Sequence, residues 1–170
     1  FYPEFDTQNI YKWVQLCLPH VYHAWNEGSM ETLGDFCTPQ FRETLLQNAQ
    51  KLAQEGKVRS CEFKLLLNSH PLGAYLRPDH TQAPEGIELV LRVEVKVIDF
   101  IKLGLGRIEG SRRAKQSQQF WTLHHNGTHW QLHQIISADD KELSYLSSST
   151  PLPPLLEWSS PKTSSATDNI

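Results

Sequence analysis

Asp99 is the residue whose position in the sequence best suits catalysis. It continues, at the same two-residue step, an apolar series made of Leu91, Val93, Val95 and Val97. In an unbroken strand its carboxylate would lie on the apolar face, where burial raises the pKa of a carboxyl group and suits it to act as a general base. The alternative is that Asp99 ends the strand and meets water or caps the next turn, because no spacing ties a second polar group to it. Asp99 is therefore the runner-up catalytic residue, and we predict no catalytic site.

Two histidines in the last part of the chain could bind a metal. A two-residue turn at Asn126-Gly127 would place His124 opposite His129, and facing imidazoles suit a transition metal. No carboxylate or cysteine completes such a site by local spacing, and the other face of this hairpin is apolar. We therefore expect the histidines to face solvent or an adjacent element, and we predict no metal site.

The segment from Ile101 to Gln116 concentrates positive charge in a chain whose net charge is −3. Its only acid is Glu109, and its five bases are Lys102, Arg107, Arg112, Arg113 and Lys115. Basic and apolar residues on a protruding turn suit an anionic lipid surface, where each cation contributes about 1 kcal/mol. A solvated hairpin is the alternative. The glycines from 104 to 110 lack the G-x-G-x-x-G spacing and precede a strand, so we predict no dinucleotide and no other cofactor. The acidic balance of the whole chain argues against nucleic acid.

Helical periodicity dominates the first third of the chain. Apolar residues recur at three- and four-residue steps over residues 6–25, and Pro19 predicts a kink or break in that helix. Residues 29–36 predict a short second helix. Thr38-Pro39 is typical of an N-cap followed by the first helical position, and it predicts a third helix that ends at Gly56.

A period of two replaces the helical pattern after Gly56. Residues 61–67 and 87–97 each predict a strand with one buried face. In the first strand the apolar positions are Cys61, Phe63, Leu65 and Leu67. Three prolines and two glycines between Pro71 and Gly86 predict a loop, with a short strand over residues 74–76 as an option.

A hairpin closes the pattern, with strands over residues 116–125 and 128–136 joined by the two-residue turn. Its core face consists of Trp121, Leu123, Trp130 and Leu132. Helices followed by antiparallel strands predict an α+β fold. We expect one domain over residues 1–146 and a Ser/Pro-rich tail over residues 147–170.

Three cysteines bear on the compartment. Cys17, Cys37 and Cys61 lie among apolar neighbours without a C-x-x-C spacing, which predicts buried thiols in a reducing compartment. One disulfide with one free thiol is the alternative. No apolar run approaches the ~18 residues of a membrane span. Because the chain begins at Phe1, we expect that an upstream signal or anchor can precede it.

Two aromatic signatures resemble those of the Tim forty-four-like family. This family contains the C-terminal domain of the mitochondrial import subunit that tethers the import motor to the inner membrane, and bacterial relatives. The first signature consists of Ala24-Trp25, Leu33 and Thr38-Pro39, and the second of Phe120-Trp121-Thr122-Leu123, Trp130-Gln131-Leu132 and Ile135. The resemblance extends from about Asn9 to Ile135. It implies a cone-shaped, nuclear-transport-factor-two-like curved sheet with helices packed across it, and roles in membrane association and protein tethering.

Two departures from the family narrow what it implies. Gln119 stands where members often carry an acid, and the long N-terminal segment of the mitochondrial protein is absent. The resemblance therefore implies the role of the domain and not a part in the import motor.

These observations predict a non-catalytic binding domain attached peripherally to an anionic membrane surface. The concave side of the sheet would hold a lipid, another hydrophobic ligand or a protein partner, and the candidate pocket-lining residues are Trp13, Trp25, Trp121 and Trp130. The expected location is the reducing side of an inner membrane, either the bacterial cytoplasmic face or the mitochondrial matrix. The alternative is a small-molecule enzyme of the same cone fold that uses Asp99 as general base. A carboxylate in a closed apolar pocket beside other polar groups would favour the enzyme.

Overall fold

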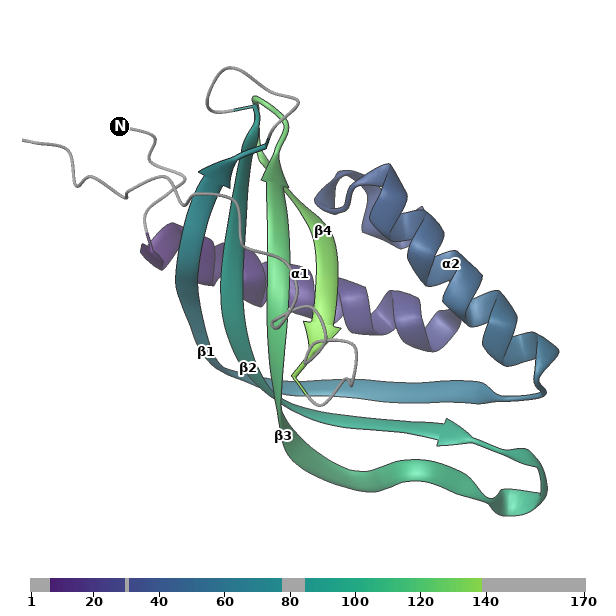
Figure 1. The fold of residues 1–170 in the computed structure, drawn as a ribbon. Coiled ribbons are helices and arrows are strands. Elements are labelled where there is room, and N and C mark those ends of the chain that lie inside the picture. Colours follow the sequence, from purple (N-terminus) through teal and green to yellow (C-terminus); the bar gives the residue numbers. More distant parts are fainter. Residues whose placement is uncertain (1–6, 30, 78–84, 139–170) are drawn as a thin grey trace, which may run out of the picture.

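The computed structural model describes residues 7–29, 31–77 and 85–138, which form helices packed on one curved antiparallel sheet (Figure 1). The helices come first and comprise α1 (Thr7–Glu27), the short 3-10 helix η2 (Glu31–Phe36) and α2 (Pro39–Gln54). The strands follow as β1 (Val58–Leu76), β2 (Ile87–Lys102), β3 (Ile108–His125) and β4 (Trp130–Ser137), and they lie in the sheet in sequence order. The predicted α+β architecture is confirmed, and it is consistent with a nuclear-transport-factor-two-like cone.

Helix α1 packs mainly across β1 and buries one apolar stripe. The stripe consists of Ile10, Val14, Cys17, Leu18 and Val21. The helix continues through Pro19, so the expected break is wrong. Pro19 and Gln15, one turn before it, both lie on the exposed face, where water can bond the carbonyl that loses its helical partner.

Helix α2 begins as its sequence predicts. The Oγ1 of Thr38 accepts a hydrogen bond from the N–H of Phe41 at 3.2 Å, and Pro39 occupies the first helical position. The N–H of Thr38 donates to the carbonyl of Leu132 at 2.9 Å. This bond ties the start of α2 to β4, so the helix is anchored at one end beside the sheet.

Strand β1 is an edge strand, and bulges interrupt its pairing with β2. Register shifts separate Phe63 from Leu65 and Leu66 from the residues that follow. The first shift moves the alternation by one position, so Leu66 is buried while Leu65 and Leu67 are exposed. The prediction that Leu65 and Leu67 share the buried face of Cys61 is therefore wrong.

The strand also continues past Pro71 to Leu76, so the loop predicted to begin at Pro71 is wrong for residues 71–76. A further register shift separates Pro71 from Gly73. An edge strand has neighbours on one side only, so a proline beside a bulge can be accommodated. The short strand expected over residues 74–76 is the end of β1, and residues 78–84 lie outside the described residues.

The closing hairpin buries the predicted core face but has a different register. Trp121, Leu123, Trp130 and Leu132 are all buried, as predicted. The strands end at His125 and begin again at Trp130, so four residues and not two form the turn. The Oδ1 of Asn126 accepts hydrogen bonds from the N–H groups of Thr128 and His129, each at 2.9 Å. The side chain of Asn126 thereby closes a longer turn than the Asn-Gly pair predicts.

A register shift between Thr122 and Leu123 changes the pairing further. His124 lies opposite Gln131, so the predicted pairing of His124 with His129 is wrong. In the same strand pair, Phe120 lies opposite Ile136.

Strand β4 covers only part of β3. It pairs with β3 from Gln119 to His125, and the N–H of Ala138 donates to the carbonyl of Gln118 at 2.9 Å. Over residues 108–117, β2 is the only described strand that pairs with β3. The sheet therefore narrows to β1, β2 and β3 below α2, and it ends in the β2–β3 hairpin (Figure 1).

The three cysteines are free and buried, as predicted. Within residues 7–29, 31–77 and 85–138, no helix is long and apolar enough to cross a membrane. The predicted tail over residues 147–170 lies outside the described residues.

Candidate functional site

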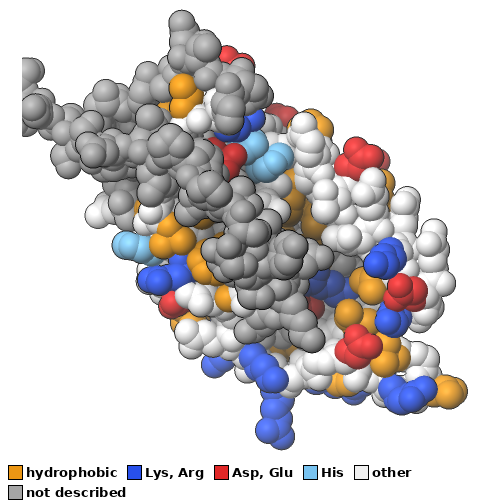
Figure 2. All heavy atoms as spheres, in the orientation of Figure 1, with side chains coloured by type: hydrophobic (Ala, Val, Ile, Leu, Met, Phe, Trp, Pro, Cys, Tyr) orange, Lys and Arg blue, Asp and Glu red, His pale blue; other side chains and the backbone are white. Residues whose placement is uncertain are grey.

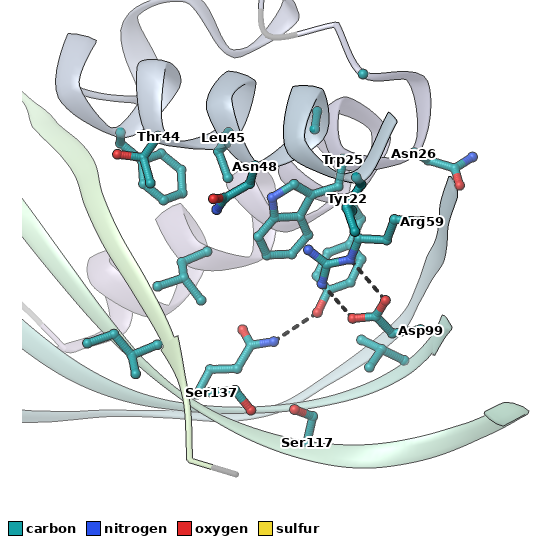
Figure 3. Close-up of a pocket in the computed structure, with 18 of the residues that line it drawn as sticks. Tyr22, Trp25, Asn26, Thr44, Leu45, Asn48, Arg59, Asp99, Ser117 and Ser137 are labelled. Carbon is teal, nitrogen blue, oxygen red and sulfur yellow. Dashed lines mark hydrogen bonds and ion pairs between the residues drawn. The ribbon is translucent and has the colours of Figure 1, made fainter. Parts of the chain in front are cut away.

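A cavity of about 920 Å³ lies between α2, the end of α1 and the concave face of the sheet (Figure 3). The amphipathic helix α2 contributes apolar Phe41, Leu45, Ala49 and Leu52 together with polar Gln40, Thr44 and Asn48. The sheet contributes a mostly polar wall, which includes Ser111, Ser117, Gln119, Gln134 and Ser137. The cavity thus combines apolar surface with groups that can form hydrogen bonds, on both its helical side and its sheet side.

Asp99 lies in the sheet wall of this cavity, on the same side as Val97, as its parity predicts. It does not end the strand, because β2 continues to Lys102. Its two carboxylate oxygens accept hydrogen bonds from Arg59, with Nε–Oδ1 at 3.0 Å and Nη2–Oδ2 at 2.5 Å. The side chains of Arg59 and Asp99 are 31% and 33% exposed. Asp99 is therefore half of an ion pair in a cavity that is open to water.

Arg59 is held from two sides. Its guanidinium lies 4.3 Å from the ring centroid of Trp25, which favours the cation. Burial opposes the charge on Arg59, but the hydrogen bonds and charge of Asp99 outweigh burial, so the pKa of Arg59 is raised. Figure 3 shows Trp25, Arg59 and Asp99 together on one wall. Sequence reasoning missed Arg59, although it stands two residues before Cys61 on the alternating face of β1.

Gln119 links β3 to α1 in the wall of the cavity. Its Nε2 donates to the Oη of Tyr22 at 2.9 Å, and its Oε1 accepts from the Nε1 of Trp121 at 2.9 Å. Burial raises the pKa of Tyr22 to about 12, so its phenol stays protonated at neutral pH. A neutral amide can accept from one neighbour and donate to the other, which a carboxylate at this position could not do. Gln119 therefore has a local structural role.

The structure divides the five predicted basic residues between two places. Arg113 and Lys115 line the cavity and are exposed, so they lie at its rim. Arg112 instead lies 5.7 Å from the ring centroid of Phe100, and Lys102 and Arg107 flank the turn of the hairpin. Figure 2 shows Lys and Arg side chains beside hydrophobic ones at this end of the molecule. Neither Arg113 nor Lys115 forms an ion pair with another described residue.

Of the four tryptophans predicted to line a pocket, Trp25 lies in the cavity wall. Trp121 and Trp130 are buried in the core, and Trp13 packs half-buried against it. The periodicity shows which tryptophans lie on the inner face, but it does not separate the packed part of that face from its open part.

The histidines form a stacked pair at another edge of the cavity. His124 and His133 have ring centroids 3.8 Å apart, and His133 also lines the cavity. The Nε2 of His124 lies 2.7 Å from the Oε2 of Glu88, and the Nδ1 of His133 lies 3.0 Å from the Oγ1 of Thr38. Burial and the neighbouring His124 lower the pKa of His133. No group of three or more His, Cys, Asp or Glu side chains that could hold a metal occurs among the described residues.

Comparisons with known proteins bear on the fold alone. No family model matches the chain, and no curated protein matches it. Among solved structures, the chain is similar to the intermembrane space region of the chloroplast protein ARC6, with a TM-score of 0.54 and 12% sequence identity. The similarity covers 79% of this chain and 98% of that chain. At this identity it supports a shared architecture and carries no activity.

Proposed function

We propose that this protein is a non-catalytic binding domain that holds an elongated anionic ligand with an apolar part. The observation that carries the proposal is the cavity of about 920 Å³, which lies within the ~300–1,000 Å³ range of ligand sites. Its α2 wall offers apolar surface, and its sheet wall offers amides and hydroxyls. Arg113 and Lys115 at the rim add two cations without an ion-pair partner among the described residues, so a ligand with negative charge is favoured.

The surroundings of Asp99 support binding better than catalysis. Asp99 does stand beside polar groups, which favours the alternative of a small-molecule enzyme. Both its oxygens, however, accept hydrogen bonds from Arg59, which takes up two of the about four acceptor positions of the carboxylate. The carboxylate is also a third exposed, whereas a strong general base is usually made by desolvation. We therefore assign Asp99 to holding Arg59 in the cavity wall.

A second function, contact with an anionic membrane surface, is favoured by the end of the β2–β3 hairpin. Leu105 is 97% exposed there and has a φ of 63°, an unusual conformation for a residue other than glycine. Lys102 and Arg107 flank it, so an apolar side chain stands between two cations. Peripheral attachment through this tip would leave the cavity open to a ligand or partner, which is the arrangement of a tether. The proposed location on the reducing side of an inner membrane rests on the resemblance and on the three free thiols.

Fluorescence of anilinonaphthalene sulfonate tests the cavity, because this dye joins an apolar ring system to one negative charge. We expect one dye to bind per chain. Ala49→Trp places a large side chain in the α2 wall and should weaken binding by at least about tenfold, while Arg113→Ser should weaken it by about fivefold through loss of one ion pair.

Arg112→Ser is the matched control, because Arg112 is the neighbour of Arg113 but does not line the cavity. Thermal unfolding of each variant verifies that the fold is kept. The absence of dye binding, or equal binding by Ala49→Trp with an unchanged melting temperature, would refute the cavity as the binding site.

A further inference from the structure

We propose that the edge of β3 that no described strand covers docks an extended acidic segment of a partner protein, which adds to the sheet as a strand. This inference rests on the proposed binding function and specifies its ligand. Its first support is the topology, because β3 pairs with β2 over its length but with β4 only from Gln119 onward. Among the described residues, the edge of β3 from Ile108 to Ser117 faces no strand. Such an edge presents N–H and C=O groups that an extended chain can pair with.

The second support is that this edge forms the rim of the cavity. Ser111, Arg113, Lys115 and Ser117 all line it. Side chains of a strand alternate between its two faces, so a strand added beside β3 would direct every second side chain into the cavity. The added strand would continue the line of β4, whose last described bond to β3 runs from Ala138 to Gln118. The main chain of the partner would then supply affinity, and the cavity would select its side chains.

The positive charge at the edge of β3 favours an acidic segment as the docked strand. Arg113 and Lys115 stand two residues apart on the cavity side of β3, and neither has an ion-pair partner in the described part of the chain. Acidic residues at alternate positions of an added strand would lie opposite them, whereas like charges opposite one another destabilise a strand pair. Pairing with a second copy of this edge would bring the two sets of cations together. The charges thus oppose self-association and favour an acidic partner.

A bulge shapes this edge. Val97 of β2 pairs with Lys115 of β3, and the next pair is Asp99 with Ser111, so β3 has extra residues between the two pairs. Within this bulge the N–H of Arg113 donates to the Oγ of Ser111 at 3.1 Å. Bulges at edges commonly prevent unspecific pairing and re-aim a side chain. The bulge here leaves the stretch from Lys115 to Ser117 as the regular part of the open edge, next to the end of β4. A docked segment would pair along this stretch and meet Arg113 where the edge becomes irregular.

Selection from a displayed library of random peptides of about twelve residues, with the full chain as the target, tests the proposal. We expect the enriched peptides to carry acidic residues at alternate positions. A selected peptide is then synthesised, and its affinity is measured by fluorescence anisotropy. The double substitution of Arg113→Ser and Lys115→Ser should weaken binding by about tenfold or more. The matched pair of Lys102→Ser and Arg107→Ser removes the same charge outside both the cavity lining and strand β3, and it should leave binding unchanged.

Backbone methylation of the selected peptide distinguishes strand addition from other modes of binding. N-methyl groups on the amides of one edge should abolish binding, while the same number on the other edge should be tolerated, because only one edge of the added strand pairs with β3. Amide hydrogen exchange should slow over residues 111–117 when the peptide binds. A library that yields no enriched peptide, or a peptide that tolerates methylation at both edges, would overturn the inference. The proposed function is judged separately by the dye, so a cavity that binds the dye but selects no strand-forming peptide refutes the docking edge alone.

Discussion

Arg59 neutralises the charge of Asp99 in the cavity wall. Its planar guanidinium donates two hydrogen bonds to Asp99 while its face lies over Trp25. A lysine at this position would keep the charge but lose both the second hydrogen bond and the flat contact with the ring. Because the charges of Arg59 and Asp99 offset each other, the wall is polar without net charge. The attraction for an anion therefore comes from Arg113 and Lys115 at the rim.

His133 should make the stability of the domain depend on pH. Burial and His124 lower its folded-state pKa below the ordinary value of 6.5, and Arg77 acts in the same direction while Glu88 opposes it. The unfolded chain therefore binds a proton at a higher pH than the folded chain does. The stability contributed by His133 is therefore present above the pKa that it has in the unfolded chain. This stability is lost as the pH falls through the pKa that His133 has in the folded chain.

The measurement is the melting temperature between about pH 7.5 and about pH 5. We expect it to fall as the pH falls, and we expect His133→Gln to reduce that fall. His23→Gln is the control, because His23 is exposed on α1 and should leave the pH dependence unchanged. An equal pH dependence in wild type and His133→Gln would contradict the assignment.

The closing hairpin holds the sheet to the start of α2. Trp130 is 4% exposed and packs edge-on against His125, with ring centroids 4.9 Å apart. Trp130→Ala should lower the free energy of unfolding by about 3–5 kcal/mol, since it removes a buried ring and leaves a cavity. Urea denaturation followed by circular dichroism measures this change.

Leu65→Ala provides the comparison, because Leu65 is 53% exposed and its truncation should cost less than about 0.5 kcal/mol. If Trp130→Ala unfolds at the same urea concentration as the wild type, the packing of the hairpin described above is wrong.

The elements themselves follow from local patterns, whereas their registers do not. The cap at Thr38 and the alternation from Leu91 to Val97 depend on near neighbours in the chain, so the sequence predicts them. Bulges such as the one between Phe63 and Leu65 depend on the partner strand and on the curvature of the sheet, and a period of two cannot indicate them. Asp99 could be placed on the inner face by parity, but its partner Arg59 lies 40 residues away and is recognised only in the fold.

The cations of the hairpin tip and those of the cavity rim should have separable effects on binding. Lys102, Arg107 and Arg112 lie on the hairpin outside the cavity, so their joint replacement by Ser should remove roughly 3 kcal/mol of attraction to an anionic surface, on the order of a hundredfold in affinity. Co-sedimentation with vesicles of phosphatidylserine and phosphatidylcholine is the measurement. Binding should also weaken as salt rises, because the Debye length shortens from about 10 Å at 0.1 M to about 3 Å at 1 M.

The control replaces Arg113 and Lys115 by Ser, which should weaken vesicle binding less than the hairpin variant does. Leu105→Asp should weaken it further, because it replaces the exposed apolar side chain of the tip with a negative charge. Equal binding to neutral and anionic vesicles, or no loss in the hairpin variant, would refute membrane contact through this tip.

The three buried cysteines can serve as probes of how often the domain opens locally. Burial raises the pKa of Cys61 to about 11 and that of Cys37 to about 12, and it raises the pKa of Cys17 as well. Thiolates are the form that reacts with alkylating reagents, so each native cysteine is protected by both enclosure and protonation. Its rate of labelling should then report how often the contacts between helices and sheet separate. The thiol of Leu105→Cys should react much faster than the native thiols, because residue 105 is exposed. A dye can therefore be placed at the tip of the hairpin without removing any native thiol.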